Sequence, residues 1–355
     1  MKKHSLLTTA IVTTLFVAPL LTPAVACTGI TLTSSDSAFV TARTIEWGES
    51  KLNSELVSVG RSAVPNSPTV AHVTTNTYGY VGIAIENTDF VVEGLNEKGL
   101  SAGLFFFPGY GDYGTAKKGE VVIGDMQLVS WLLGNFSNVA EVKHALQNVR
   151  LQSSVKGAGT VHFRVLDATG AQIVIEAIDG KLTVMDNPVG VLTNSPDFKW
   201  QMTNLNNYVN LKTGSATATE WGKVQLKAFG AGAGLMGLPG DITPPSRFVR
   251  AAFMQNSMPE ALTTDETVLY AFKILNAFEI PIGLELPDTK TKTPLLSAVQ
   301  WTSGSDLTNK VFYFRTHDDS QIRRVDLKAI NFKDAARIHE PLEVTNRAAV
   351  RDLKL

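Results

Sequence analysis

The chain of 355 residues is long enough for one large domain with a sizeable core, or for two modest ones. It carries 32 Lys and Arg against 33 Asp and Glu, and this near-neutral balance argues against nucleic acid or an anionic membrane as a partner. Its single cysteine excludes an intrachain disulfide and a zinc site built from several cysteines.

The first 26 residues have the three parts of a secretory signal of bacterial type. Residues 2–3 (Lys-Lys) give a positive start, an apolar stretch runs from residue 6 to residue 21, and residues 24–26 (Ala-Val-Ala) form a small-x-small cleavage site. Prolines interrupt the apolar stretch, which disfavours a permanent membrane span. Cleavage would leave residues 27–355 as a periplasmic or secreted protein that begins with Cys27.

A cysteine directly after a leader is also where bacterial lipoproteins are processed. That cut usually requires Leu or a similar residue three positions upstream, where this chain has Ala24. Ordinary signal peptidase cleavage is therefore the preferred interpretation. The alternative matters because lipidation would cap both the thiol and the amine of Cys27, and would indicate a lipid-anchored binding protein without catalysis.

The sequence after the leader predicts blocks of strands with helices between them. Apolar and alternating runs predict strands over residues 28–33, 39–47, 56–59, 78–85, 90–93, 102–107, 162–166, 172–178, 182–185, 297–302, 310–315 and 321–327. Apolar residues at helical spacing predict helices over residues 125–136, 139–149, 246–255 and 265–278. The glycine-rich residues 229–234 lack the Lys-Ser/Thr ending of a P-loop and are interpreted as a flexible loop. Paired helices between strand blocks favour antiparallel sheets covered by helices, in one domain over residues 27–355.

A cysteine at the first position of the processed chain would carry its own base. Only the thiolate of cysteine is a strong nucleophile, so the thiol needs a proton acceptor. The α-amine has an unperturbed pKa of about 7.7–8.0 and lies within one water molecule of its own sulfur. Cys27 would therefore supply nucleophile and base together. The structural alternative, a buried apolar filler, is harder to arrange for the first residue of a chain.

The histidines offer no competing site by their spacing. After the leader they are scattered, without the spacing of metal ligands, at His72, His144, His162, His317 and His339. Each is interpreted as a surface residue or a hydrogen-bonded core residue.

Six short segments, separated along the chain, form a combined pattern. They are residues 27–29 (Cys-Thr-Gly), 41–47 (Thr-Ala-Arg-Thr-Ile-Glu-Trp), 93–100 (Glu-Gly-Leu-Asn-Glu-Lys-Gly-Leu), 192–196 (Leu-Thr-Asn-Ser-Pro), 237–241 (Gly-Leu-Pro-Gly-Asp) and 246–248 (Ser-Arg-Phe). Together they resemble the choloylglycine hydrolase family, cysteine N-terminal-nucleophile hydrolases that include penicillin V acylases and conjugated bile salt hydrolases. The resemblance covers nearly all of the chain after the leader. It implies an α+β fold of four αββα layers, with two stacked antiparallel sheets between layers of helices.

The resemblance also implies an acyl-transfer site around Cys27 as nucleophile. Arg43 matches the arginine beside the nucleophile, where a fixed positive charge favours the thiolate. Arg247 matches a second active-site arginine. Asn194 matches the asparagine whose side-chain amide helps to form the oxyanion hole, and the backbone N–H of Phe105 matches the other donor. No metal or organic cofactor is needed.

Two positions depart from the family pattern and bear on the substrate. Glu46 stands where the family usually has Asp, which keeps a carboxylate near the α-amine on a longer arm. Phe105 stands where members carry Asn or Tyr. The aromatic side chains around these positions predict a substrate-binding wall, although alternate residues of a strand must face the core. That wall would consist of Trp47, Phe105, Phe106, Phe107 and Tyr110.

An aromatic entrance suits the phenoxyacetyl group of penicillin V or the acyl chain of an N-acyl homoserine lactone. With its leader, the chain resembles the penicillin V acylases of Gram-negative bacteria, so we rank penicillin V acylase first and conjugated bile salt hydrolase second. The expected partner is a small-molecule amide. Because family members are often tetramers, the resemblance also predicts a homotetramer.

Overall fold

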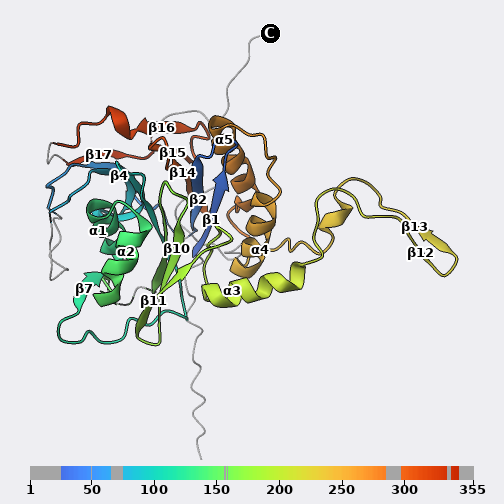
Figure 1. Cartoon of the computed structure of the whole chain (residues 1–355), viewed down its shortest axis with the longest axis horizontal. Coiled ribbons are helices and arrows are strands. Elements are labelled where there is room, and N and C mark those ends of the chain that lie inside the picture. Colours follow the sequence, from blue (N-terminus) through green and yellow to red (C-terminus); the bar gives the residue numbers. More distant parts are fainter. Residues whose placement is uncertain are drawn as a thin grey trace, which may run out of the picture.

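The computed structural model has two stacked β-sheets between layers of helices (Figure 1). It describes residues 25–48, 50–64, 75–155, 157, 159–284, 297–333 and 337–343. Most of the predicted leader, residues 1–24, lies outside the described part. Within that part, no helix has both the length and the apolar character that crossing a membrane would require.

The smaller of the two stacked sheets carries Cys27 on its edge strand. Its strands are antiparallel, in the order β1 (Val25–Thr33), β2 (Phe39–Trp47), β14 (Val299–Asp306), β15 (Val311–Thr316) and β16 (Arg323–Asp326). On β1 and β2, Cys27 pairs with Ile45 and Gly29 pairs with Arg43, so these four residues point to one face. An isolated bridge from Gly29 to Leu192 ties the edge strand to the loop that follows the other sheet.

The larger sheet stacks on that face and is antiparallel throughout. Its order is β11 (Lys181–Asp186), β10 (Gln172–Ile178), β9 (Val161–Leu166), β6 (Ser101–Phe106), β5 (Asn87–Asn96), β4 (Tyr80–Ile85), β3 (Glu55–Val59) and β17 (Arg337–Pro341). The two sheets meet where β1 lies next to β6 and where β14 and β15 lie next to β5. Side chains such as Ile30 and Phe105 fill this interface and are fully buried.

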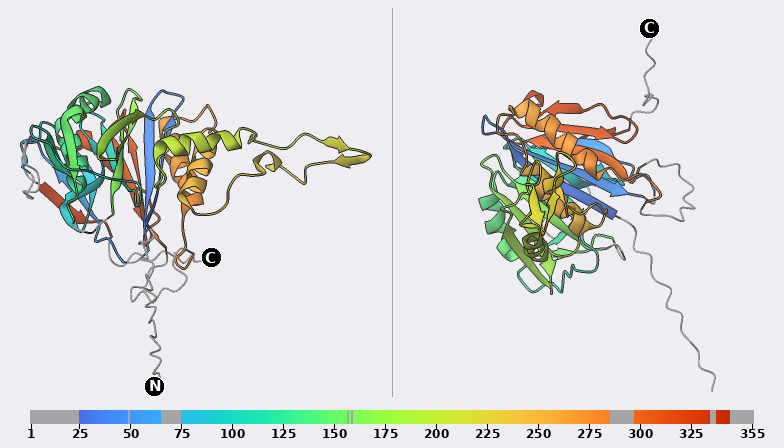
Figure 2. Two further views of the ribbon diagram at one scale, coloured as in Figure 1. Left: turned by 90° about the horizontal axis from the view of Figure 1, so that it is seen from below. Right: turned by 90° about the vertical axis from the view of Figure 1, so that its right-hand side faces the viewer.

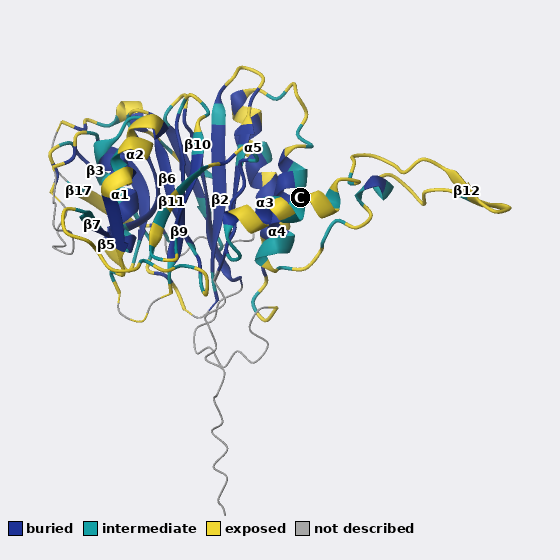
Figure 3. Ribbon diagram, turned by 60° about the horizontal axis from the view of Figure 1, so that its bottom comes forward, coloured by how far each residue is buried: buried dark blue, intermediate teal, exposed yellow. Residues whose placement is uncertain are grey.

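Helices cover the outer faces of both sheets. α4 (Pro244–Gln255) packs on β1, and α5 (Thr264–Leu275) packs on β2 and β14. On the other side, α1 (Leu128–Asn135) packs on β5 and β6, with α2 (Val139–Ala145) beside it (Figure 1). The strands between these layers are mostly buried (Figure 3). The predicted four-layer αββα architecture is confirmed.

Local sequence explains where the two helices over the smaller sheet begin. Two prolines form the first turn of α4, where their fixed φ suits the helix and their missing N–H groups would have no helical partner. A capping box between Thr263 and Glu266 starts α5. The start of α4 matters for function because Arg247 lies in its first turns, facing β1.

A long arm leaves the body between α3 (Phe198–Asn204) and α4 (Figure 2). Its far end is a short hairpin of β12 (Thr219–Trp221) and β13 (Val224–Leu226), and the glycine-rich residues 229–234 lie on the returning limb. The arm exposes Trp221 and Phe229 to solvent. The predicted homotetramer stays a prediction.

Several elements differ from those expected. The helix predicted over 139–149 ends at Ala145, because its last residues turn as a 3₁₀ helix and enter β8 (Val149–Gln152), which pairs in parallel with β7 (Val121–Gly124). The helix predicted over 125–136 likewise starts with a 3₁₀ turn, and α1 proper begins at Leu128. Tertiary pairing thus overrides helical spacing at the ends of both segments.

Candidate active site

The thiol of Cys27 lies buried between the two sheets and is held by donors from both. Arg43 of β2 donates from Nη2 to the sulfur over 2.8 Å, and the backbone N–H of Phe106 on β6 bonds to it as well. Burial raises the pKa of the Cys27 thiol above its ordinary value, whereas Arg43 and the Phe106 N–H act to lower it. The donor set favours a sulfur that carries negative charge.

Gly29 makes room for this arrangement. A Cβ at this position would lie 2.6 Å from Nη1 of Arg164 and 2.8 Å from Cζ of Phe105. Both neighbours are fully buried and have little space to move. The Cys-Thr-Gly start of the predicted processed chain therefore has a steric reason: the glycine admits the groups that pack beneath Arg43.

Asn194 has the orientation expected of an oxyanion donor. Its Oδ1 accepts hydrogen bonds from the backbone N of Cys27 over 2.9 Å and from Nη2 of Arg247 over 2.8 Å, while its Nδ2 donates to the Phe106 carbonyl over 2.8 Å. Two donors on one side and an acceptor on the other fix which atom of the amide is nitrogen. The second N–H of Nδ2 can then serve a reacting carbonyl oxygen, close to the Phe106 N–H.

Arg247 and Glu46 complete the polar surroundings of Cys27. Arg247 is fully buried and donates from Nη1 to the carbonyl oxygen of Cys27 over 2.6 Å and to Oγ1 of Thr28 over 2.9 Å. Oε2 of the buried Glu46 lies 3.9 Å from the same nitrogen. Glu46 pairs with Ala26 across β1 and β2, so its carboxylate stands beside the junction that the predicted cleavage would cut.

The aromatic residues divide between core and surface. Phe105 packs its ring under Arg43, with the guanidinium carbon 4.1 Å from the ring centroid, and Phe107 is fully buried. Trp47 and Phe106 are half-buried, and Tyr110 is 46 % exposed. Phe107 therefore belongs to the core and not to the predicted substrate wall. The backbone donor at the sulfur belongs to Phe106, one residue beyond the predicted Phe105.

Sequence reasoning missed a second set of buried polar residues, which consists of Glu93, His162, Arg164 and Glu176. His162 and Arg164 lie on β9, a strand buried at every position. A charged or polar residue inside an unbroken apolar run is the signal that could have indicated them, because such a residue needs a buried partner.

His162 supports the segment that carries Asn194. Its Nε2 lies 3.1 Å from the carbonyl oxygen of Thr193, and its Nδ1 lies 3.0 Å from Oε1 of Glu176. The ring stacks on Phe107 at 4.4 Å between centroids and meets Phe105 edge-on at 6.2 Å. A carbonyl oxygen can only accept, so Nε2 carries a proton. The residue before Asn194 is thus held directly against β9, the strand next to β6.

Replacing His162 by leucine is expected to lower kcat by about 10- to 100-fold, less than the 10²–10³ lost with an oxyanion donor itself, and to leave KM nearly unchanged. His162→Gln keeps a donor toward the Thr193 carbonyl and should recover most of the loss. Steady-state kinetics on folded variants would check this. A wild-type kcat in the leucine variant would show that the oxyanion donors hold their positions without the imidazole.

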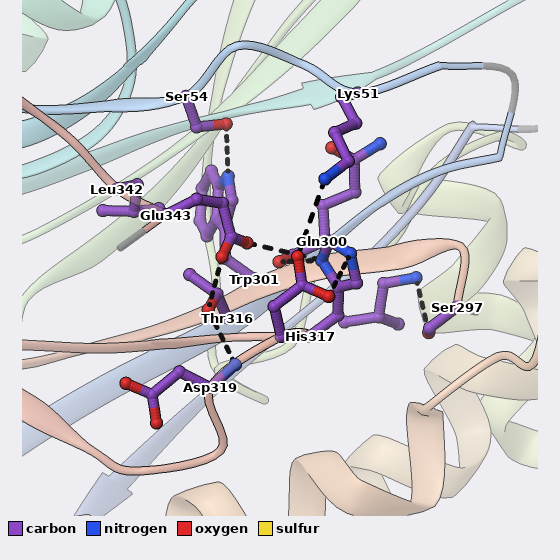
Figure 4. A network of polar contacts seen from close by, with 12 residues as sticks. Lys51, Ser54, Ser297, Gln300, Trp301, Thr316, His317, Asp319, Leu342 and Glu343 are labelled. Atoms are coloured by element: carbon purple, nitrogen blue, oxygen red, sulfur yellow. Dashed lines mark hydrogen bonds and ion pairs between the residues drawn. The ribbon is translucent and has the colours of Figure 1, made fainter. Parts of the chain in front are cut away.

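The loop that follows Trp47 is fastened to β14, in part by the bond between Trp301 and Ser54 that Figure 4 shows. Nε2 of Gln300 donates to the carbonyl oxygens of Trp47 and Ser50 over 2.7 Å and 2.5 Å, and Nε1 of Trp301 donates to Oγ of Ser54 over 3.1 Å. These contacts set the position of Trp47 at the end of the strand that carries Arg43.

Metal-type ligands gather in the described residues at His317, Asp318 and Glu343. Asp318 faces Nε2 of the imidazole at 3.2 Å and Glu343 faces Nδ1 at 3.5 Å, so the carboxylates lie at different nitrogens of one ring (Figure 4). One ion bound to an imidazole contacts one nitrogen. Nζ of Lys51 also lies 3.6 Å from Asp318. The cluster is better described as an ion-pair network than as a metal centre.

Comparison with known proteins places this geometry in context. The family model described as linear amide C–N hydrolases, choloylglycine hydrolase family, matches residues 27–340. A bile salt hydrolase/transferase of Clostridium perfringens is 33% identical over 313 residues, covering 86% of this chain and 93% of its own length. A penicillin V acylase of Pectobacterium atrosepticum is 30% identical over 262 residues, covering 68% of this chain and 62% of its own length. A crystal structure of a conjugated bile acid hydrolase variant from Clostridium perfringens superimposes with a TM-score of 0.81 at 30% identity, covering 92% of this chain and all of the other.

Proposed function

Since the chain belongs to the linear amide C–N hydrolases of the choloylglycine hydrolase family, we propose that it hydrolyses the amide bond of conjugated bile salts. The observation that carries the chemistry is the setting of Cys27. Its sulfur accepts hydrogen bonds from Arg43 and from the Phe106 N–H, while its nitrogen is held by Asn194. After processing, that nitrogen becomes an α-amine next to the sulfur, and nucleophile and base share one residue.

The reaction proposed is acyl transfer in two stages. The sulfur of Cys27 attacks the amide carbonyl carbon, and the α-amine takes the thiol proton. Nδ2 of Asn194 and the N–H of Phe106 hold the oxygen that becomes negative. The C–N bond then breaks, and the amine leaves with the proton from the α-ammonium group. Water hydrolyses the thioester with the α-amine as base, which releases the acid and restores the thiol.

Conjugated bile salts come ahead of penicillin V on two grounds, which reverses the order expected from the sequence. The bile salt hydrolase/transferase relative matches a larger share of both chains than the penicillin V acylase relative. The aromatic wall on which penicillin V was ranked first also loses Phe107 to the core. Penicillin V remains the second candidate, because a penicillin V acylase is 30% identical to this chain and Trp47 and Tyr110 are not fully buried.

A substrate panel tests this order directly. Hydrolysis of glycocholate, taurocholate, penicillin V, penicillin G or an N-acyl homoserine lactone frees a primary amine in every case, so one amine-detection assay serves all of them. With processed protein we expect kcat/KM for glycocholate or taurocholate to exceed that for penicillin V by at least about tenfold. Cys27→Ala protein is the matched blank. Faster cleavage of penicillin V would restore the original order, and no amine from any substrate would contradict the proposal.

A further inference from the structure

A line of buried charges runs from the nucleophile into the interface between the sheets. Nη1 of Arg43 lies 3.6 Å from Oε2 of Glu93, and Oε1 of Glu93 lies 3.7 Å from Nη2 of Arg164. All three side chains are at most 2% exposed, and they come from β2, β5 and β9. Arg164 also donates to the carbonyl oxygens of Ile30 and Ala42 over 3.1 Å and 3.3 Å.

The surrounding residues are shaped to admit this line. A Cβ at Gly103 would overlap the carboxylate of Glu93, and a Cβ at Gly29 would lie 2.6 Å from Nη1 of Arg164. The ring of Phe105 lies near both guanidinium groups, with centroid distances of 4.1 Å to the carbon of Arg43 and 5.5 Å to that of Arg164. The two glycines and the ring of Phe105 thus make room for the Glu93 carboxylate and the Arg164 guanidinium. Neither of these groups contacts the sulfur of Cys27.

The charges of this region do not cancel unless the sulfur is ionised. Arg43 and Arg164 contribute two positive charges and Glu93 one negative charge. The pair of Arg247 and Glu46 on the other side of Cys27 adds none. In the pair of His162 and Glu176, Nε2 donates to a carbonyl oxygen and one proton lies between Nδ1 and Oε1, so the pair adds none whichever atom carries that proton. One positive charge is left over in a buried region, where Coulomb interactions are strong. In the described chain, where the nitrogen of Cys27 is an uncharged amide, a thiolate at Cys27 would bring the sum to zero.

Arg164 is the residue that creates this excess. Arg43 and Glu93 alone would form a neutral pair, whose attraction for a neighbouring thiolate is weak. A second cation shares the carboxylate and leaves Arg43 with positive charge to offer the sulfur. Burial lowers the pKa of Arg164 to about 10, which still leaves its guanidinium charged at neutral pH, and burial raises the pKa of Glu93 against the pull of two cations.

We propose that Arg164 is a positioning residue for Cys27: by sharing Glu93 with Arg43, it maintains the net positive charge that stabilises the thiolate. The inference rests on the proposed function, in which Cys27 is the nucleophile, and adds a residue that touches neither the sulfur nor the substrate.

Restoring the charge sum tests the proposal. Arg164→Met removes one positive charge and should raise the apparent pKa of the Cys27 thiol. Iodoacetamide reacts with the thiolate, so at a pH below that pKa the alkylation rate is proportional to the thiolate fraction. The rate should therefore fall about tenfold for each unit by which the thiol pKa rises. Arg164→Met with Glu93→Gln removes one charge of each sign and should return the alkylation rate to within about threefold of the unmodified enzyme. Arg164→Lys keeps the charge and should also stay close to it. Rate against pH on processed protein is the measurement, with circular dichroism as the check on folding.

The outcomes separate a charge effect from a packing effect. An unchanged thiol pKa in Arg164→Met, or a double variant that is slower than the single one, would overturn the proposal. If Arg164→Met fails to fold, the double variant decides the question. Alkylation of the double variant at least tenfold slower than that of the unmodified enzyme would overturn the proposal. Alkylation needs no turnover. If the variants behave as expected while no amide of the panel is cleaved, the proposed substrate fails and the role of Arg164 stands.

Discussion

Replacing Cys27 by alanine is expected to lower amide hydrolysis by at least about 10⁴-fold and to leave a folded protein. The substitution removes one sulfur atom, whereas the backbone hydrogen bonds of residue 27 to Asn194 and Arg247 remain. Without the sulfur, the oxyanion donors have no covalent intermediate to stabilise. Primary-amine release from glycocholate measures the loss.

A thermal melt of the same variant is the control for folding. Turnover clearly above the uncatalysed rate would contradict the role of Cys27, because the proposed acyl transfer has no other nucleophile. A melt that shifts by many degrees would instead indicate that the sulfur contributes to packing.

A single residue left in front of Cys27 is expected to abolish activity as completely as the Cys27→Ala substitution does. In the described chain, the N–H of Cys27 is an amide that donates to Oδ1 of Asn194 over 2.9 Å, and an amide nitrogen cannot accept the thiol proton. Ala26 is also buried, in a small apolar cluster with Ile280 and Ala298. The unprocessed strand thus lacks the base and fills space next to the nucleophile.

Two short forms made without the leader provide the comparison. One begins at Met-Cys27 and the other at Met-Ala26-Cys27, and N-terminal mass analysis confirms removal of methionine from each. We expect bile salt hydrolysis from the first form only. Equal activity in both would place the base elsewhere. Mass analysis of the exported chain adds a separate test, because a diacylglyceryl group on Cys27 would contradict the predicted cleavage.

Much of the fold was predictable because its strands keep a simple pattern between polar turns. The strand over residues 39–47 was predicted to its last residue, since a polar turn precedes it and it pairs with β1 along its whole length. The arm with β12 and β13 was not predicted. Its strands are three residues each and exposed, so they bury no apolar face that would leave a periodic signal.

The candidate site was predictable through the resemblance more than through local pattern. Cys27, Arg43, Asn194 and Arg247 are far apart in the chain, and the structure brings them into hydrogen-bonding contact. Phe107 lies in the core, and the backbone donor at the sulfur is Phe106 and not Phe105, for one reason. In a strand, a shift of one residue exchanges the two faces, so a run of three phenylalanines does not indicate which ring faces the core or which N–H faces the sulfur.

Two of the residues that were missed, Glu93 and Arg164, are important because of the charges that they bring together. Nothing in the run Val-His-Phe-Arg-Val-Leu over residues 161–166 indicates that its arginine meets Glu93. That contact requires β9 and β5 to lie on either side of β6, an order which the sequence alone does not provide.

The position of Cys27 on an edge strand ties catalysis to local stability. Chain ends usually fray, yet here the predicted first residue carries the chemistry. Its carbonyl and its nitrogen are held by Arg247 and Asn194, and the Gly29–Leu192 bridge closes the strand against a loop more than 160 residues away in the sequence. Opening of this one strand end would silence the enzyme while both sheets stay folded. We therefore expect activity to depend on this small local equilibrium, which hydrogen exchange at Gly29 would report, rather than on global unfolding.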